Sequence, residues 1–323
     1  MKWKIQILCI LAAVCLLLSA GCAGNKTTGQ KEPATAWYHF TDAAGVEILL
    51  PQKPEKVAVL FSSYADLWNI AGGTVQISVG ESAERGFVDS TIPLVDSGAG
   101  KTINNELLLS YQPDFVICSA DIPAQKETAA ILNENGIPAA QFHVESFEDY
   151  LAALKICTDI TGNPDAYQAS GVALKTQISD LLEKTQQYTG GQKMKILFIR
   201  AGSTDQSTKA KTAEENFVCR MLDELGTYNI AENAPILLDG LSFEEILSED
   251  PDYIFFSFMG KEAAAKVYVE SLLQENTWKS LTAVKSGNYT FLPKELFHFK
   301  PNAKWADAYR YLAGFLYPGL AVN

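Results

Sequence analysis

The sequence predicts an α/β fold of two similar lobes, whose mostly parallel sheets are joined by one long backbone helix. Two observations support this prediction: a helix, turn and strand pattern that occurs twice, and one long amphipathic segment between the two copies. Strands that alternate with helices favour parallel sheets covered by helices on both faces. The 323 residues also suit two lobes, since single hydrophobic cores rarely grow beyond about 250–300 residues.

The repeated unit is clearest in residues 104–119, which align without gaps on residues 242–257. Both copies contain a Glu, a Leu-Ser pair and a Pro-Asp pair at matching positions, and both end in Ser. Residues 56–61 and 195–200 form a second matching pair at nearly the same offset. Each unit is typical of a short helix, a Pro-Asp turn and a buried strand. Chance similarity of common segments is the alternative, but the agreement of the two offsets favours duplicated architecture.

A long helix is predicted over residues 164–187, because Asn163 suits the N-cap and Pro164 the first helical position. Its apolar stripe, at helical spacing, consists of Tyr167, Leu174, Ile178, Leu181 and Leu182. At 1.5 Å per residue the helix is about 36 Å long, enough to run along both lobes. We therefore predict an N-terminal lobe over 37–162, a connecting helix over 163–189 and a C-terminal lobe over 190–323. A single helical crossing implies a stiff hinge and only modest closure.

The N-terminal segment is predicted to export and anchor the chain. Residues 5–18 form an apolar run behind Lys2 and Lys4, shorter than the ~20 residues of a membrane-spanning helix. The string Leu-Ser-Ala-Gly-Cys that ends at Cys22 resembles a bacterial lipoprotein cleavage box, in which the cysteine is acylated. We expect a signal peptide over 1–21 and a flexible, lipid-anchored tether over 22–36. The alternative is an ordinary signal peptide with an incidental cysteine.

Composition excludes several classes of protein. Without residues 1–21 the chain has 24 basic and 38 acidic residues, a net charge of about −14, which argues against nucleic-acid binding. Hydrophobic residues make up 47% of the sequence, so a large core is expected rather than disorder. Cys118, Cys157 and Cys219 are odd in number and widely spaced, a pattern that predicts neither a disulfide framework nor a zinc site. We expect all three in the core.

From Phe40 onward the sequence resembles the helical-backbone class (class III) of ABC-importer binding proteins, which serve ferric siderophores, haem and cobalamin. The resemblance rests on the order of short motifs at 51–57, 105–106, 113–114, 161–162, 225–226, 229–230, 278, 283–284 and 300–305. It departs from the family pattern at Asn105, where a hydrophobic residue usually precedes the glutamate. The resemblance implies a carrier without enzymatic activity, outside the cytoplasm at the cell membrane. Its implied partners are an ABC permease and its ATPase subunits.

In this family one glutamate per lobe docks into arginines of the permease, and Glu106 and Glu244 are the matching positions. Asn104 suits the N-cap of the helix that carries Glu106. Ser242 and Glu245 have the spacing of a capping box, which would leave Glu244 pointing outward. The alternative is that both glutamates only stabilise the positive ends of helix dipoles.

Candidate ligand-binding residues lie at the predicted strand ends, because ligands of doubly wound sheets bind beyond the carboxyl ends of the strands. The first lobe offers Ser63 and Tyr64 there, and the second offers Arg200 and Phe258. An arginine at a strand end suits an anionic group, although an ion pair between the lobes is an equal alternative. Phe297 and His298 precede the last helix, where the family projects an aromatic loop toward the ligand. A packing role is the alternative for His298.

The expected ligand is an organic iron chelate, with a ferric siderophore first, haem second and cobalamin third. His298 is the reason for retaining haem as a candidate ligand, since imidazole is a common ligand of haem iron. No resident metal or cofactor is expected, because the iron would arrive with the ligand. A bare-metal carrier is disfavoured because the three histidines are far apart in the sequence. The rival from another class is a metal chelatase-like enzyme on a related two-lobed fold, although nothing resembles a nucleophilic triad.

Overall fold

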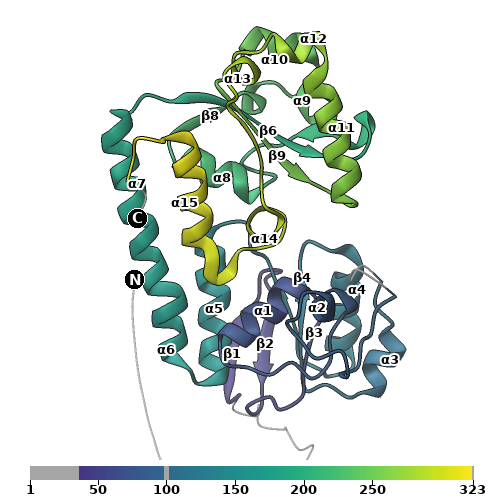
Figure 1. Cartoon of the computed structure of the whole chain (residues 1–323). Coiled ribbons are helices and arrows are strands. Elements are labelled where there is room, and N and C mark those ends of the chain that lie inside the picture. Colours follow the sequence, from purple (N-terminus) through teal and green to yellow (C-terminus); the bar gives the residue numbers. More distant parts are fainter. Residues whose placement is uncertain (1–35, 98–101, 322–323) are drawn as a thin grey trace, which may run out of the picture. The chain divides into compact units, whose positions relative to one another are not determined.

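The computed structural model describes residues 36–97 and 102–321, which form an α/β protein with a sheet in each of two lobes (Figure 1). The predicted signal peptide, Cys22 and nearly all of the tether lie outside the described residues. In the described part of the chain, no helix is both long enough and apolar enough to cross a membrane.

The N-terminal lobe is built on a three-stranded parallel sheet of order β3–β4–β5. Its strands are Val57–Val59, Phe115–Ser119 and Ala139–Phe142. An antiparallel hairpin precedes it, formed by β1 (Tyr38–Thr41) and β2 (Glu47–Leu50). The helices of this lobe are α1 (Ser62–Ile70), α2 (Gly80–Glu84), α3 (Asn105–Ser110), α4 (Pro123–Glu134) and α5 (Phe147–Thr161).

The long connecting helix is confirmed, with one irregularity that the sequence pattern did not predict. It consists of α6 (Pro164–Tyr167), a π-helical turn (Gln168–Val172) and α7 (Ala173–Thr189). The Asn163 side chain caps it by accepting a hydrogen bond from the Ala166 N–H at 3.2 Å. A π-turn pairs backbone groups five residues apart instead of four, and the hydroxyl of Tyr150 donates to the Ser170 carbonyl in this turn at 2.8 Å. The predicted apolar stripe of α7 is buried at Leu174, Ile178 and Leu181.

The C-terminal lobe has a five-stranded sheet centred on β6 (Met194–Ala201). It pairs in parallel with β8 (Thr227–Asn229) and β9 (Tyr253–Phe258), and antiparallel with β7 (Lys209–Ala210); β10 (Tyr289–Phe291) extends the sheet in parallel from β9. Its helices are α8 (Phe217–Glu224), α9 (Ile236–Asp239), α10 (Phe243–Glu249), α11 (Glu262–Gln274), α12 (Asn276–Lys279), α13 (Thr282–Lys285), α14 (Lys294–Phe297) and α15 (Trp305–Leu316). The last helix returns to pack against α7 (Figure 1).

The predicted duplication is confirmed at the level of single hydrogen bonds. In the first copy, between α3 and β4, the Asp114 N–H donates to the Lys56 carbonyl at 3.0 Å, and the Asp114 carboxylate accepts from the Lys56 N–H at 2.8 Å. In the second copy, between α10 and β9, Asp252 makes the same two bonds to Lys195, both at 2.8 Å. Each Pro-Asp turn therefore fastens the start of its strand to the start of the neighbouring strand.

The two helix starts of the repeat differ, and one sequence prediction is wrong. Asn104 caps α3 as predicted, accepting from the Leu107 N–H at 3.0 Å. At α10, Ser242 occupies the N-cap position but its side chain makes no capping bond, so the predicted capping box with Glu245 is absent. Only the backbone closes this turn, through the Ile246 N–H donating to the Ser242 carbonyl.

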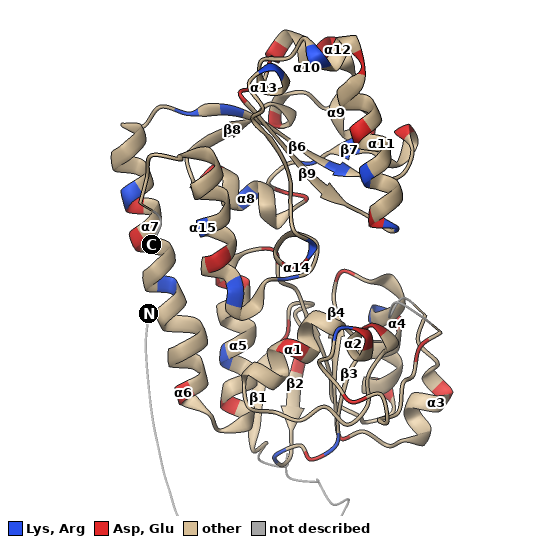
Figure 2. Ribbon diagram, viewed as in Figure 1, with Lys and Arg blue, Asp and Glu red and all other residues tan. Residues whose placement is uncertain are grey.

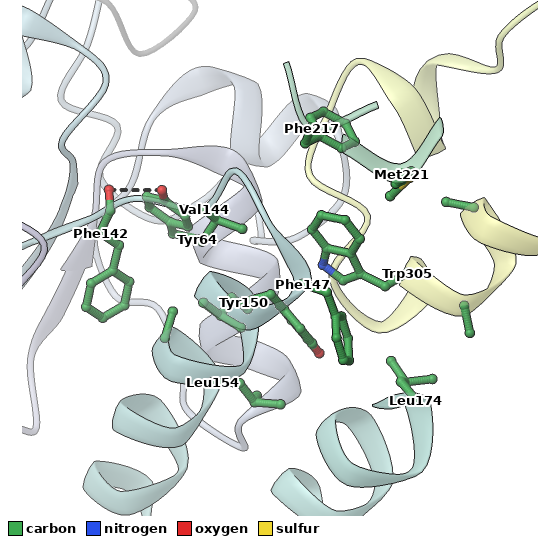
Figure 3. Packing of buried hydrophobic residues seen from close by; sticks show 14 of the residues in the cluster. Tyr64, Phe142, Val144, Phe147, Tyr150, Leu154, Leu174, Phe217, Met221 and Trp305 are labelled. Atoms are coloured by element: carbon green, nitrogen blue, oxygen red, sulfur yellow. Dashed lines mark hydrogen bonds between the residues drawn. The ribbon is translucent and has the colours of Figure 1, made fainter. Parts of the chain in front are cut away.

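Side chains alternate between the two faces of a strand, and both faces are buried in β4 and in the middle of β6. In β4, Ile117 and Val116 belong to different hydrophobic clusters, and in β6 Phe198 and Leu197 do so as well. Ile117 and Phe198 lie in one common cluster, so the two lobes share a continuous core, part of which Figure 3 shows. The three cysteines are free and buried, as predicted, and burial raises the pKa of each thiol.

Candidate ligand-binding cleft

A cavity of about 180 Å³ lies between segments of the two lobes, beyond the carboxyl ends of their central strands. We call it the interlobe cavity. The N-terminal lobe lines it with residues at or after the ends of β3, β4 and β5: Phe61, Ser119, Asp121, Ile122 and Glu145. The C-terminal lobe supplies Arg200, Glu215, Asn216, Phe217, Ser257, Phe297, His298 and Lys300. The cavity therefore has aromatic walls and several charged groups.

The internal repeat brings two matched serines to this cavity. Ser119 ends β4 and Ser257 lies near the end of β9, and both line the cavity. The Ser257 hydroxyl donates to the Phe297 carbonyl at 3.4 Å, which ties β9 to the end of α14. Because parallel strands end at the same edge of a sheet, duplicated strands present duplicated side chains to the gap between the lobes.

Arg200 is the strongest candidate for binding an anion. It lies at the end of β6 and lines the interlobe cavity. Burial lowers the pKa of its guanidinium, while the nearby carboxylate of Glu145 acts in the opposite direction. Among the described residues, no hydrogen bond or ion pair of the Arg200 side chain is found. The guanidinium therefore keeps hydrogen-bond donors for a planar, charged ligand group such as a carboxylate.

His298 lines the same cavity and has an unused nitrogen. Its Nδ1 atom is buried and has no hydrogen-bond partner among the described residues. Burial, with the cations Lys294, Arg200 and Arg85 as further causes, lowers the pKa of His298 to about 4. The imidazole is therefore neutral near pH 7, which leaves a nitrogen lone pair able to accept a hydrogen bond or to bind a metal.

An ion pair crosses the interlobe cavity from one lobe to the other. Lys300 Nζ lies 2.5 Å from Glu145 Oε1, and the two side chains are only 11% and 23% exposed. It is the most buried of the ion pairs found in the described part of the chain. Glu145 follows β5 in the first lobe, whereas Lys300 follows α14 in the second.

A second cavity, of about 450 Å³, is lined by Lys300 and by Arg85, which lies just after α2. The Arg85 guanidinium carbon lies 3.7 Å from the ring centre of Phe299 and 4.5 Å from that of Phe87. Its Nη1 donates to the hydroxyls of Ser62 and Ser63, at 2.9 and 3.1 Å. Figure 2 shows basic residues at α14, beside this region. Lys300 lines both cavities, so the two cavities flank one segment of chain.

Half of the ligand-binding residues predicted from the sequence line the interlobe cavity: Arg200, Phe297 and His298. Ser63, Tyr64 and Phe258 are buried and do not line it. Ser63 and Tyr64 lie in the first turn of α1, which turns them into the protein, and the Tyr64 hydroxyl donates to the Phe142 carbonyl at 3.0 Å (Figure 3). Phe258 packs against Phe291, with ring centres 5.5 Å apart.

The two predicted docking residues occupy matching places on the two lobes. Glu106 lies in the first turn of α3 and Glu244 in the first turn of α10, and both are exposed. Figure 2 shows acidic residues on α3 and near α10. Neither carboxylate takes part in an ion pair or hydrogen bond that the described residues provide.

Several cavity residues were not predicted, although part of the signal was present in the sequence. Ser119 and Ser257 occupy the same position in the two copies of the repeat. The sequence could therefore have predicted that both serines lie at strand ends. The sequence could not have predicted Glu145 and Lys300, because their ion pair depends on how segments 155 residues apart pack together. Phe217 is the first residue of α8 and follows the capping residue Asn216. The local sequence pattern indicates the start of this helix only weakly. Among the described residues, no group of three or more His, Cys, Asp or Glu side chains is placed to hold a metal.

Comparisons with known proteins agree with this geometry. A family model for periplasmic binding proteins (Peripla_BP_2) matches residues 57–296. No curated protein sequence matches the chain significantly. The haem-binding protein RhuT from Roseiflexus sp. RS-1 is similar in structure, with a TM-score of 0.65 and 18% identity over 82% of this chain and 98% of RhuT.

Two further solved structures share the fold. SirA of Staphylococcus aureus, in complex with staphyloferrin B, has a TM-score of 0.68 and 15% identity, covering 88% of this chain and 100% of SirA. The vitamin B12-binding protein BtuF of Vibrio cholerae has a TM-score of 0.65 and 18% identity, covering 82% of this chain and 97% of BtuF. With the family match spanning most of the chain, these likenesses lead to one conclusion. The chain belongs to the periplasmic binding protein family, which places it among binding proteins rather than enzymes.

Proposed function

We propose that the protein captures an organic iron chelate outside the cytoplasm and delivers it to an ABC permease. A ferric siderophore is the first candidate for this chelate. The observation that carries this proposal is Arg200, a half-buried cation without a protein partner among the described residues, at the cavity between the lobes. Phe61, Phe217 and Phe297 surround that cavity with aromatic surface. Ligand pockets commonly combine apolar walls with a few such polar anchors.

The ligands bound by proteins of the same fold support the chelate class. SirA was solved with staphyloferrin B, RhuT is described as haem-binding and BtuF as vitamin B12-binding. A bulky chelate would extend over both cavities, because the interlobe cavity of about 180 Å³ is smaller than the ~300–1,000 Å³ typical of small-molecule pockets. Iron would come with the ligand, so no resident cofactor is proposed.

A titration of the purified mature chain tests this function. Tryptophan fluorescence would be followed during addition of ferric siderophores, haemin and cobalamin. We expect saturable binding of a ferric siderophore, and Arg200→Ala should weaken it about tenfold or more, equivalent to ~1.4 kcal/mol. The matched control is Arg220→Ala, because Arg220 is exposed on α8 and does not line either cavity. Failure of every chelate to bind, or binding of free divalent metal alone, would reject the proposal.

Haem is the second candidate, and the unpaired Nδ1 of His298 favours it. The neutral imidazole has a lone pair that suits haem iron. A shift of the haemin Soret band that is lost in His298→Ala would replace the siderophore by haem. Retention of the same spectrum in His298→Ala would remove the reason for preferring haem over cobalamin.

We also propose that Cys22, which lies outside the described residues, is acylated and holds the mature protein at the membrane. The sequence around it supports this proposal. Intact-mass analysis of the exported protein should show a chain that begins at Cys22 with a diacylglyceryl addition. A mature N-terminus elsewhere would contradict it.

A further inference from the structure

Three acidic residues line the interlobe cavity, and each has a basic partner. Asp121 pairs with His143 at 2.6 Å, and Glu215 pairs with Lys211 at 3.0 Å. Neither of those two basic partners lines the cavity. Glu145 differs from the other two acids, because its partner Lys300 is itself a cavity residue.

Glu145 also acts on the second strong cation of the cavity. Its carboxylate lines the same cavity as Arg200 and opposes the lowering of the Arg200 pKa by burial, although the two side chains form no ion pair in the described part of the chain. Lys300 and Arg200 are the only Lys or Arg side chains among the residues described as lining the interlobe cavity. One carboxylate of the N-terminal lobe is therefore paired with Lys300 in a cavity that Arg200, a second cation of the C-terminal lobe, also lines.

This arrangement places a protein carboxylate where an anionic ligand group would be bound. Charges attract strongly in a partly buried cavity, because the effective dielectric constant is lower than in water. Two cations left without a counter-charge in such a place would be unfavourable. The Glu145 side chain is 23% exposed, so it lies close enough to solvent to be hydrated when another anion takes its place.

We infer that Glu145 is a specificity-determining residue that acts as an internal counter-ion. Before a ligand binds, its carboxylate neutralises Lys300 beside Arg200, and an anionic chelate binds both cations by displacing it. A neutral or cationic chelate gains nothing from the displacement and is therefore disfavoured. This inference rests on the proposed function and narrows its ligand class to chelates that carry carboxylate, catecholate or other anionic groups.

The test compares Glu145→Gln with the wild-type mature chain. The probes are ferric enterobactin (an anionic tris-catecholate), haemin, whose propionates are anionic, and ferrioxamine B, a cationic hydroxamate. We expect Glu145→Gln to bind at least one anionic probe about tenfold more tightly, without a matching gain for ferrioxamine B. The control is Glu148→Gln, which removes the same charge three residues further along the chain. Glu148 is exposed on α5 and lines neither cavity.

The outcomes separate the two proposals. If no probe binds the wild type, the proposed function fails and the inference falls with it. If an anionic probe binds the wild type and Glu145→Gln binds it equally or more weakly, only the inference is wrong. Tight binding of ferrioxamine B alone would also overturn the inference. Should Glu145→Gln not fold, Glu145→Asp keeps the charge but shortens its reach to Lys300, and we then expect a smaller gain of the same sign.

Discussion

At the residue scale, the charge of each basic group in the cavity depends on its residue type as well as on its burial. Two of its bases illustrate this point. Arg200 remains a cation despite burial, since an arginine is protonated under all ordinary conditions. His298 is neutral, because the same burial and the surrounding cations oppose its protonation. One group is therefore suited to an anionic part of a ligand, and the other to a hydrogen-bond donor or a metal.

The neutral state of His298 predicts a pH dependence of stability. The pKa in the folded protein is about 4, below the ordinary value of 6.5, so the unfolded chain takes up a proton first as the pH falls. Stability should therefore decrease from about pH 6.5 down to pH 4, by up to ~2 kcal/mol, a figure reduced because solvent reaches part of the ring.

Urea unfolding at a series of pH values would measure this dependence. His298→Gln should lose less stability than the wild type over that interval. His39→Gln, which removes an exposed imidazole from β1, is the control for removal of a histidine elsewhere. An unchanged pH profile in His298→Gln would contradict the prediction.

At the scale of elements, the segment between α14 and α15 fastens the C-terminal lobe to helix α1. Asn302 has a left-handed backbone with φ of 51°, and its side-chain amide donates to the Ser63 carbonyl at 2.7 Å and to the Asp66 carboxylate at 2.8 Å. Asn is one of the few residues that tolerate this conformation. The same segment carries His298 and Lys300 past the two cavities, so its anchoring positions cavity residues of the second lobe against the first.

The helix starts of α3 and α10 are the elements from which we predict permease docking. Glu106→Arg combined with Glu244→Arg should abolish uptake and leave ligand affinity unchanged, because both residues are exposed and neither lines the interlobe cavity or the cavity beside Arg85. Opposite charges on the two partners orient a complex and accelerate encounter, and reversal turns that attraction into repulsion. Loss of the helix-dipole contribution should lower stability by only about 0.3–1 kcal/mol per site.

Uptake by cells that express the double variant, beside a ligand titration of the purified protein, would check this prediction. The control is Glu127→Arg with Glu262→Arg, which reverses one exposed charge on each lobe, on α4 and α11. Normal uptake by the Glu106 and Glu244 variant would show that these glutamates do not dock.

At the scale of the whole described fold, the lobes share one hydrophobic core with Trp305 inside it. The indole is 1% exposed and lies 5.9 Å from Phe147 of α5 and 5.7 Å from Phe217 of α8, measured between ring centres (Figure 3). Phe147 belongs to the first lobe and Phe217 to the second. We therefore expect this joint to resist independent movement of the lobes.

We therefore expect Trp305→Ala to destabilise both lobes together, by about 3–5 kcal/mol, since it leaves a large cavity at their joint. Trp305→Phe should be milder, because the indole nitrogen is buried without a hydrogen-bond partner among the described residues and its removal has no hydrogen bond to break. Hydrogen exchange in α5 and α8, with urea unfolding, would measure both effects. Exchange that accelerates in only one of these helices would contradict a shared core.

The sequence by itself determined the class of fold, the duplicated units and the connecting helix, because all three are written in local patterns. The cap at Asn163 and the apolar stripe of α7 depend on neighbours within a few residues, and the Pro-Asp turns are visible as a short motif that occurs twice. The place of Arg200 at the cavity could also be predicted from the sequence, because ligands bind beyond the strand ends in this kind of sheet.

The tertiary structure alone decided which side chains meet in the cavity. Tyr64 was expected at the cavity but lies in the core, because the chain enters α1 directly after β3 and rotates that side chain inward. The Glu145–Lys300 pair and the bonds of Asn302 to α1 join segments more than 150 residues apart, a distance that no local pattern spans. Charge pairing of this kind follows from how the lobes pack, and packing depends on the whole set of buried side chains rather than on any one motif.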